Sequence, residues 1–182
     1  MSWGKLLQPD LVLGDSVLSL TSEIIQKHEI KGLVLDVDET LVPIRDSDTS
    51  PELTAWVETV KTVASLWLVS NNISQYRIAR IANSLNIPYI AGAAKPSRRK
   101  LKKAVDAMNL PVEKVAMVGD RLFTDVLAGN RLGMFTILVE PISNDGLDLS
   151  NYTVRSFEVW VSQVLGASLN MANHGLVSED KK

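Results

Sequence analysis

Apolar and polar positions along the chain form blocks that predict strands alternating with helices. Five short apolar runs have the length expected of strands buried on both faces of a sheet. They lie near residues 32–36, 66–70, 88–91, 115–119 and 134–139. Between these runs, apolar residues recur at helical spacing, as at Leu53, Trp56, Val57 and Val60. This alternation predicts an α/β fold in which helices cover both faces of a central parallel sheet.

Helices are expected where a capping residue precedes an apolar pattern of helical period. Thr21 can cap a helix that runs to about His28, and Ser50 with Pro51 begins another. Further helices are expected from residue 74, over 96–109, over 122–131 before a C-capping glycine at 133, and over 152–165. We expect one domain over residues 1–165, with residues 1–20 as an irregular arm and 166–182 as a flexible tail.

Composition narrows the class of protein. The chain has 182 residues, enough to bury a core, and it has no cysteine, which excludes disulfides and thiolate metal sites. A net charge of −2 argues against a dedicated nucleic-acid binder. No apolar run approaches the ~20 residues that span a bilayer, and the N-terminus lacks a signal-peptide core. We therefore expect a cytoplasmic protein, with peripheral contact on the inner face of a membrane left open.

Polar side chains follow the predicted strands where each strand ends. Asp36 and Asp38 come directly after the first strand, and Thr40 follows them. Because side chains at i and i+2 of an extended segment point the same way, both carboxylates can face one centre. Carboxylates at the carboxyl end of a parallel strand are typical of Mg²⁺ and phosphoryl-transfer sites, although Asp is also common in simple turns.

The later strands continue this pattern, and the set resembles a known family. Ser70 and Asn71 end the second strand, Lys95 follows the third, and Asp120 and Asp125 follow the fourth. In this order the fragments resemble the motifs of the haloacid dehalogenase (HAD) superfamily of phosphatases, across about residues 32–139. The resemblance implies a HAD-like Rossmannoid three-layer sandwich.

The resemblance also implies catalytic and metal-binding roles. Asp36 would be the nucleophile and would pass through an aspartyl-phosphate. Asp38 would protonate the leaving oxygen and then activate water. Mg²⁺ would be held by the Asp36 carboxylate, the Asp38 backbone carbonyl and Asp120.

The remaining motif residues would handle the phosphate. Ser70 and Lys95 would grip its oxygens, aided by Thr40 and by backbone donors near Asn71. Asp125 would bind the metal through water or orient Lys95, or it would only complement a helix dipole. Glu39 departs from the usual uncharged residue of this motif, and we expect its side chain to point into solvent.

The spacing of the motifs leaves no room for the cap module that many HAD enzymes carry. An open site cannot enclose a small metabolite, so it suits a phosphate on a lipid head group, a protein side chain or a nucleic-acid end. The sequence around Asp36 and Asp120 resembles that of the YqeG-type subfamily (HAD class IIIA), whose organellar relatives are phosphatidylglycerophosphate phosphatases. This resemblance implies that the chain converts phosphatidylglycerophosphate to phosphatidylglycerol.

Other substrates and a non-catalytic role are also compatible with the sequence. The substrate could be a nucleotide, a sugar phosphate or a phosphoprotein, and a non-catalytic HAD-like binding module is a further alternative. If the substrate is a lipid, membrane contact could come from apolar residues of the arm, or the arm could pack on its own sheet. These arm residues are Trp3, Leu6, Leu7, Leu11 and Val12, and a basic helix over 98–103 could assist.

Overall fold

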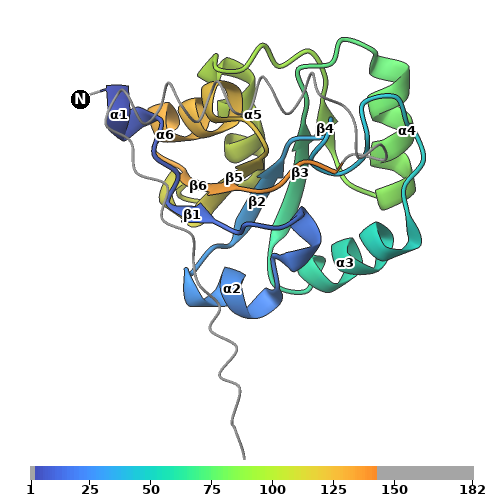
Figure 1. The fold of residues 1–182 in the computed structure, drawn as a ribbon, viewed down its shortest axis with the longest axis horizontal. Coiled ribbons are helices and arrows are strands. Elements are labelled where there is room, and N and C mark those ends of the chain that lie inside the picture. Colours follow the sequence, from blue (N-terminus) through green and yellow to red (C-terminus); the bar gives the residue numbers. More distant parts are fainter. Residues whose placement is uncertain (1–2, 143–182) are drawn as a thin grey trace, which may run out of the picture.

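The computed structural model describes residues 3–142, which form a six-stranded parallel sheet with helices on both faces (Figure 1). The sheet has the strand order β1-β6-β5-β2-β3-β4. The strands are β1 (Leu11–Val12), β2 (Gly32–Leu35), β3 (Ser65–Val69), β4 (Tyr89–Ile90), β5 (Val115–Gly119) and β6 (Phe135–Leu138). The parallel α/β sheet expected from the alternating pattern is confirmed.

Apart from α1, which was not expected, the helices begin and end close to the positions that the sequence signals. They are α1 (Trp3–Leu6), α2 (Ser22–Lys27), α3 (Pro51–Lys61), α4 (Gln75–Leu85), α5 (Arg98–Met108) and α6 (Leu127–Leu132). Three short turns accompany them: η1 (Val17–Ser19), η2 (Val112–Lys114) and η3 (Leu122–Val126). The hydroxyls of Thr21 and Ser50 accept hydrogen bonds from the first turns of α2 and α3, and Gly133 ends α6 in the left-handed conformation.

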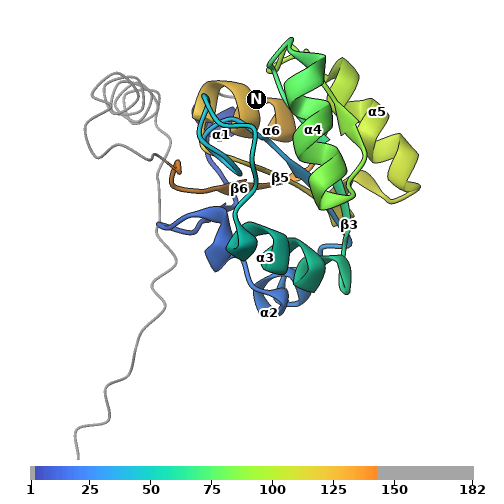
Figure 2. The ribbon, with the colours of Figure 1, turned by 90° about the vertical axis from the view of Figure 1, so that its right-hand side faces the viewer.

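The strands are apolar along their length because each face of the sheet meets a layer of helices. Leu33 and Leu35 of β2 join the core formed with α2, α3 and α4, whereas Val34 joins the core formed with α5 and α6. Figures 1 and 2 show α2 and α3 on one side of the sheet and α5 and α6 on the other. Between residues 36 and 95 the described chain holds only α3, β3, α4, β4 and loops, with no inserted cap module.

The order of the strands reverses direction at β2. From β2 the chain moves outward to β3 and β4, and it then returns to the other side of β2 to form β5 and β6. Open α/β sheets bind ligands at such a reversal point, outside the carboxyl ends of the strands. The carboxyl ends of β2, β3 and β5 are therefore where a site is expected.

The N-terminal arm is more ordered than expected. Instead of being irregular, residues 1–20 contain α1, η1 and the edge strand β1, which pairs in parallel with β6. Two residues are too few to show a periodic pattern, so β1 is fixed by its partner. The Asp10 carboxylate helps to hold β1 against β6, because it accepts hydrogen bonds from the backbone N–H and the hydroxyl of Thr136.

Two expectations fall outside the described part of the chain. The predicted helix over 152–165 and the predicted tail over 166–182 both lie there, so the extent of the domain to residue 165 stays a prediction. Within residues 3–142, every helix is too short or too polar to cross a bilayer.

Candidate active site

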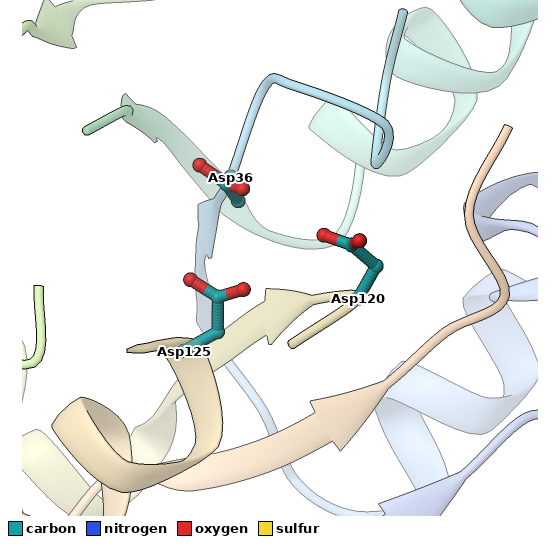
Figure 3. A group of neighbouring side chains, drawn as sticks. All are labelled: Asp36, Asp120 and Asp125. Carbon is teal, nitrogen blue, oxygen red and sulfur yellow. The ribbon is translucent and has the colours of Figure 1, made fainter. Parts of the chain in front are cut away.

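Three buried carboxylates meet at the carboxyl ends of β2 and β5. Asp36 directly follows β2, Asp120 directly follows β5, and Asp125 lies in η3. Each offers an oxygen within 4.8 Å of the other two (Figure 3). The three residues are at most 7% exposed, although carboxylates normally lie in solvent. Such a cluster needs positive charge nearby.

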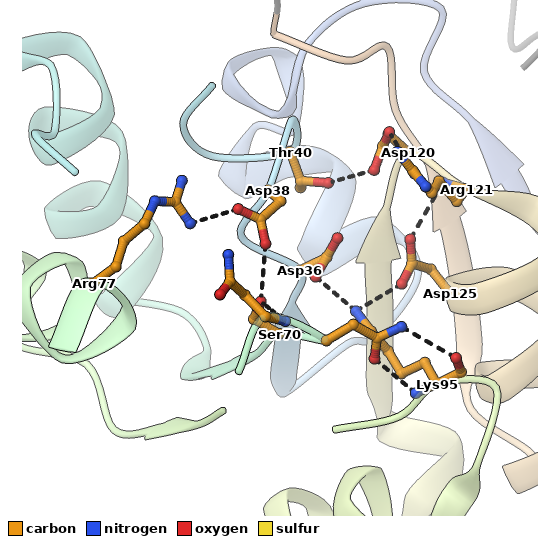
Figure 4. A network of polar contacts seen from close by, with 11 residues as sticks. Asp36, Asp38, Thr40, Ser70, Arg77, Lys95, Asp120, Arg121 and Asp125 are labelled. Atoms are coloured by element: carbon orange, nitrogen blue, oxygen red, sulfur yellow. Dashed lines mark hydrogen bonds and ion pairs between the residues drawn. The ribbon is translucent and has the colours of Figure 1, made fainter. Parts of the chain in front are cut away.

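Lys95 supplies that charge from the loop between β4 and α5. Its Nζ atom lies 2.7 Å from Asp36 Oδ1 and 2.7 Å from Asp125 Oδ1, and the ammonium group is buried (Figure 4). For Asp125, this contact favours a role in orienting Lys95 over a simple helix-dipole role. The lysine therefore joins two of the three carboxylates.

Gly119 makes room for Asp125. A Cβ atom at position 119 would lie 2.4 Å from the Asp125 carboxyl carbon, closer than any real contact allows. The wide π-helical turn η3 turns Asp125 back toward β5, where its Oδ2 accepts a hydrogen bond from Arg121 N at 3.2 Å. A glycine at position 119 is thus required by the packing of Asp125, six residues later.

Burial and mutual repulsion shift the proton affinity of the cluster. Burial, followed by the charge of Asp125, raises the pKa of Asp36 to about 6, although Lys95 opposes the shift. Burial and the charge of Asp36 also raise the pKa of Asp120 to about 6, and burial raises that of Asp125. For Lys95, burial alone would lower the pKa, but the charges of Asp125 and Asp36 raise it above its usual value. The cluster therefore carries excess negative charge that a further cation would relieve.

Asp38 lies at the mouth of the site and is held from two sides. Ser70 donates a hydrogen bond from Oγ to Asp38 Oδ2 at 3.1 Å, and Arg77 Nη1 contacts Asp38 Oδ1. Arg77 also donates to the carbonyls of Pro43 and Asp46, at 3.0 and 2.7 Å. Sequence analysis missed Arg77, because a basic residue in the first turn of an amphipathic helix has no distinguishing pattern.

Thr40 and Asn71, expected to bind phosphate, contact other residues of the site. Thr40 donates to Asp120 Oδ1 at 3.1 Å. The Asn71 side chain pairs with the Lys95 backbone, accepting from its N–H at 2.7 Å and donating to its carbonyl at 3.1 Å. Both residues therefore help to position Asp120 and Lys95, which surround Asp36, and any direct phosphate contact stays a prediction.

The expectation for Glu39 was wrong. Its side chain does not point into solvent: the residue is 4% exposed and Oε1 accepts a hydrogen bond from Ile44 N at 2.8 Å. Glu39 takes a left-handed backbone conformation, with φ at 62°, so the extended alternation assumed for this loop does not hold. Its carboxylate fixes the loop after Asp38.

Comparisons with known proteins agree with this geometry. A family model described as HAD-hydrolase-like matches residues 92–159. The chain is 38% identical over 133 residues to a probable phosphatase, YqeG, of Bacillus subtilis, covering 72% of this chain and 77% of that protein. It is 29% identical over 160 residues to the chloroplastic phosphatidylglycerophosphate phosphatase 1 of Chlamydomonas reinhardtii. That match covers 82% of this chain but only 60% of the relative.

A solved structure supports the fold. NagD from Escherichia coli K-12 superposes with a TM-score of 0.50 at 16% identity, covering 66% of this chain and 92% of that one. At this identity the likeness concerns the fold alone. The family follows from the Bacillus relative, which is matched over most of its length, together with the ordered motifs that meet at the carboxyl ends of the strands. This chain belongs to the HAD superfamily of phosphatases, in its YqeG-type subfamily.

Proposed function

We propose that this phosphatase is a Mg²⁺-dependent phosphomonoesterase that forms an aspartyl-phosphate on Asp36. The observation that carries the proposal is the buried Lys95, held 2.7 Å from the Asp36 carboxylate and backed by Asp125. A buried ammonium beside a carboxylate nucleophile is suited to binding a phosphate dianion as it approaches.

The donor set fits a magnesium ion. Carboxylate oxygens are the hard ligands that Mg²⁺ prefers, and Asp36 and Asp120 have pKa values raised to about 6 by burial and by neighbouring charge. Asp36, Asp120 and the backbone carbonyl of Asp38 would hold the ion. When bound, it would offset negative charge on the transferring phosphoryl group.

The protein's own side chains account for bond making and breaking. An Asp36 oxygen attacks phosphorus, the ester P–O bond breaks, and protonated Asp38 gives its proton to the leaving alkoxide. Asp38, now a carboxylate, takes a proton from water, which attacks phosphorus and releases phosphate and free Asp36. Ser70, which contacts Asp38, and Lys95, which contacts Asp36, would bind the non-bridging oxygens.

For the substrate we propose phosphatidylglycerophosphate, which would yield phosphatidylglycerol. Two observations support it: the Chlamydomonas relative bears that activity in its name, and no cap module lies between residues 36 and 95 to enclose a small substrate. A head group that projects from a bilayer can reach an open site of this kind.

Two measurements test the proposal. Asp36→Asn keeps the side-chain volume but removes the nucleophile, so turnover should fall by more than about a hundredfold with the circular dichroism spectrum unchanged. Asp48→Asn, at an exposed carboxylate, is the matched control and should keep full activity. Chelation should stop turnover and Mg²⁺ should restore it.

A substrate panel separates the alternatives. It should contain phosphatidylglycerophosphate, an aryl phosphate, a nucleotide, a sugar phosphate and a phosphopeptide. Preference for a soluble phosphoester would reject the lipid substrate but keep the mechanism. A folded protein with no turnover on any member would indicate a binding module instead.

A further inference from the structure

Exposed hydrophobic side chains gather beside the site. Among the residues that the structure describes, four large hydrophobic side chains are exposed: Leu18, Ile44, Ile73 and Tyr76. Ile73 and Tyr76 are 87% and 80% exposed, between the end of β3 and the first turn of α4, and Ile44 lies in the loop after Asp38. We call Ile44, Ile73 and Tyr76 the apolar lip.

Hydrogen bonds hold the two segments of the apolar lip together at the mouth of the site. Arg77, next to Tyr76, donates to the carbonyls of Pro43 and Asp46 on either side of Ile44. The Glu39 carboxylate accepts a hydrogen bond from the Ile44 N–H, which fixes the backbone position of Ile44. The same Arg77 contacts Asp38 (Figure 4), so the segments that carry the apolar lip are joined through one side chain to the proposed acid.

Ile73 also lies close to the loop that carries Lys95. A Cβ atom on Gly92 would lie 3.8 Å from Ile73 Cγ2 and 3.6 Å from Lys100 Nζ, so Ile73 lies over the loop that leads to Lys95. Lys100 donates to the carbonyls of Ala91 and Gly92, at 2.8 and 2.7 Å, which adds a fixed positive charge beneath Ile73.

We propose that the apolar lip inserts into the surface of an anionic bilayer and thereby brings a phosphomonoester head group to Asp36. The inference rests on the lipid substrate proposed above. The charges suit it: Arg45 is exposed beside Ile44, and the nearby Asp48 carboxylate is paired with Arg80. Tyrosine, with an apolar ring and a polar hydroxyl, is suited to the interfacial depth.

Two apolar side chains of the N-terminal arm, Leu7 and Val12, are not available for this role. Leu7 is fully buried and Val12 is 6% exposed, because both pack against Leu138 and the η3 segment. These side chains would have to leave their own core before they could enter a membrane. The apolar lip is already exposed and therefore needs no such rearrangement.

The test uses the full chain and compares Ile73→Ser/Tyr76→Ser with Leu18→Ser. Leu18 is also exposed but lies on η1, which contacts α3. Three substrates are offered: phosphatidylglycerophosphate in phosphatidylcholine–phosphatidylglycerol vesicles, a short-chain water-soluble phosphatidylglycerophosphate, and p-nitrophenyl phosphate. Flotation with the same vesicles, without substrate, measures binding separately.

The double variant should lose about tenfold or more in vesicle binding and in the rate on vesicle substrate, since two interfacial side chains are removed. Its rates on both soluble substrates, and every rate of Leu18→Ser, should stay within about twofold of wild type. Tyr76→Trp should retain vesicle binding, because tryptophan also prefers the interface.

Two results would overturn the proposed role of the apolar lip: unchanged vesicle binding in the double variant, or an equal loss of rate on all three substrates. A different result would reject the substrate proposal: wild-type protein would hydrolyse p-nitrophenyl phosphate but not the short-chain lipid.

Discussion

Arg77 and Asp38 form an ion pair that joins the first turn of α4 to the loop after β2. Ser70 holds the second oxygen of the same carboxylate, at 3.1 Å. The orientation of the proposed acid is therefore set by two partners from different segments of the chain. Its ability to reach the leaving oxygen depends on both.

Arg77→Ala should slow hydrolysis of alkyl phosphates more than that of p-nitrophenyl phosphate. We expect a loss of about tenfold to a hundredfold on an alkyl ester, because a mispositioned acid cannot protonate a basic leaving group. The loss on p-nitrophenyl phosphate should be much smaller, because nitrophenolate leaves without a proton. Steady-state kcat on both esters measures the difference.

Arg80→Ala is the control for this prediction, since Arg80 lies one turn further along α4 and pairs with the exposed Asp48. It should behave as wild type. An equal loss on both esters in Arg77→Ala would mean that Arg77 supports only the local fold.

Asp120→Asn should stabilise the metal-free protein at pH 7.5. Burial raises the Asp120 pKa to about 6 from 3.8, so the folded state holds the proton more tightly than the unfolded state. The ionised carboxylate therefore destabilises the fold progressively as the pH rises from about 4, and fully above about 6. Removing it should raise the free energy of unfolding by roughly 1–3 kcal/mol at pH 7.5 and hardly change it at pH 4.

Urea denaturation in the presence of a chelator, at both pH values, measures this gain. Asp48→Asn should show no gain at either pH, because its carboxylate is exposed. If Asp120→Asn were equally stabilising at both pH values, removal of the buried charge would not be the cause.

Gly119→Ala should damage both stability and activity. The new Cβ overlaps the Asp125 carboxyl group, so η3 must shift and Lys95 loses one of its two partners. We expect a cost of roughly 1–3 kcal/mol in unfolding free energy and a large drop in turnover. Gly129→Ala is the matched control, since its Cβ would meet Thr136 at 2.6 Å, away from the carboxylates. It should lose stability but keep its activity per folded molecule.

Leu7→Ala tests the role of the N-terminal arm. Leu7 is fully buried with Val12, Leu122 and Leu138, so truncation should cost about 2–5 kcal/mol in unfolding free energy. The half-buried Leu6 should tolerate alanine better. Deleting residues 1–12 should therefore destabilise the domain as well, because it removes both Leu7 and Val12 from this core. A Leu7→Ala protein as stable as wild type would contradict this role of the arm.

The central strands and most of the motif residues could be predicted because each combines local signals. A buried apolar run followed directly by Asp36 or Asp120 gives both the strand and the end at which a ligand binds. Burial on both faces also explains why β2 and β5 read as unbroken apolar runs.

What the sequence did not reveal depends on contacts between distant segments. β1 has two residues and owes its pairing to β6, so it carries no pattern of its own. Arg77 resembles any surface arginine until the loop of Pro43 and Asp46 is placed beside it. Glu39 was misjudged because a left-handed residue breaks the alternation of an extended loop.

The position of β5 in the sheet also affects folding during synthesis of the chain. β2, which leads directly to the proposed nucleophile Asp36, is flanked by β3 and β5, and the Thr40–Asp120 hydrogen bond joins residues 80 positions apart. A nascent chain that ends before β5 therefore exposes one unpaired edge of an apolar central strand, which is a template for aggregation. Long-range pairing of this kind is slow to form. The edge of β2 that precedes Asp36 thus stays unpaired until synthesis has passed residue 119.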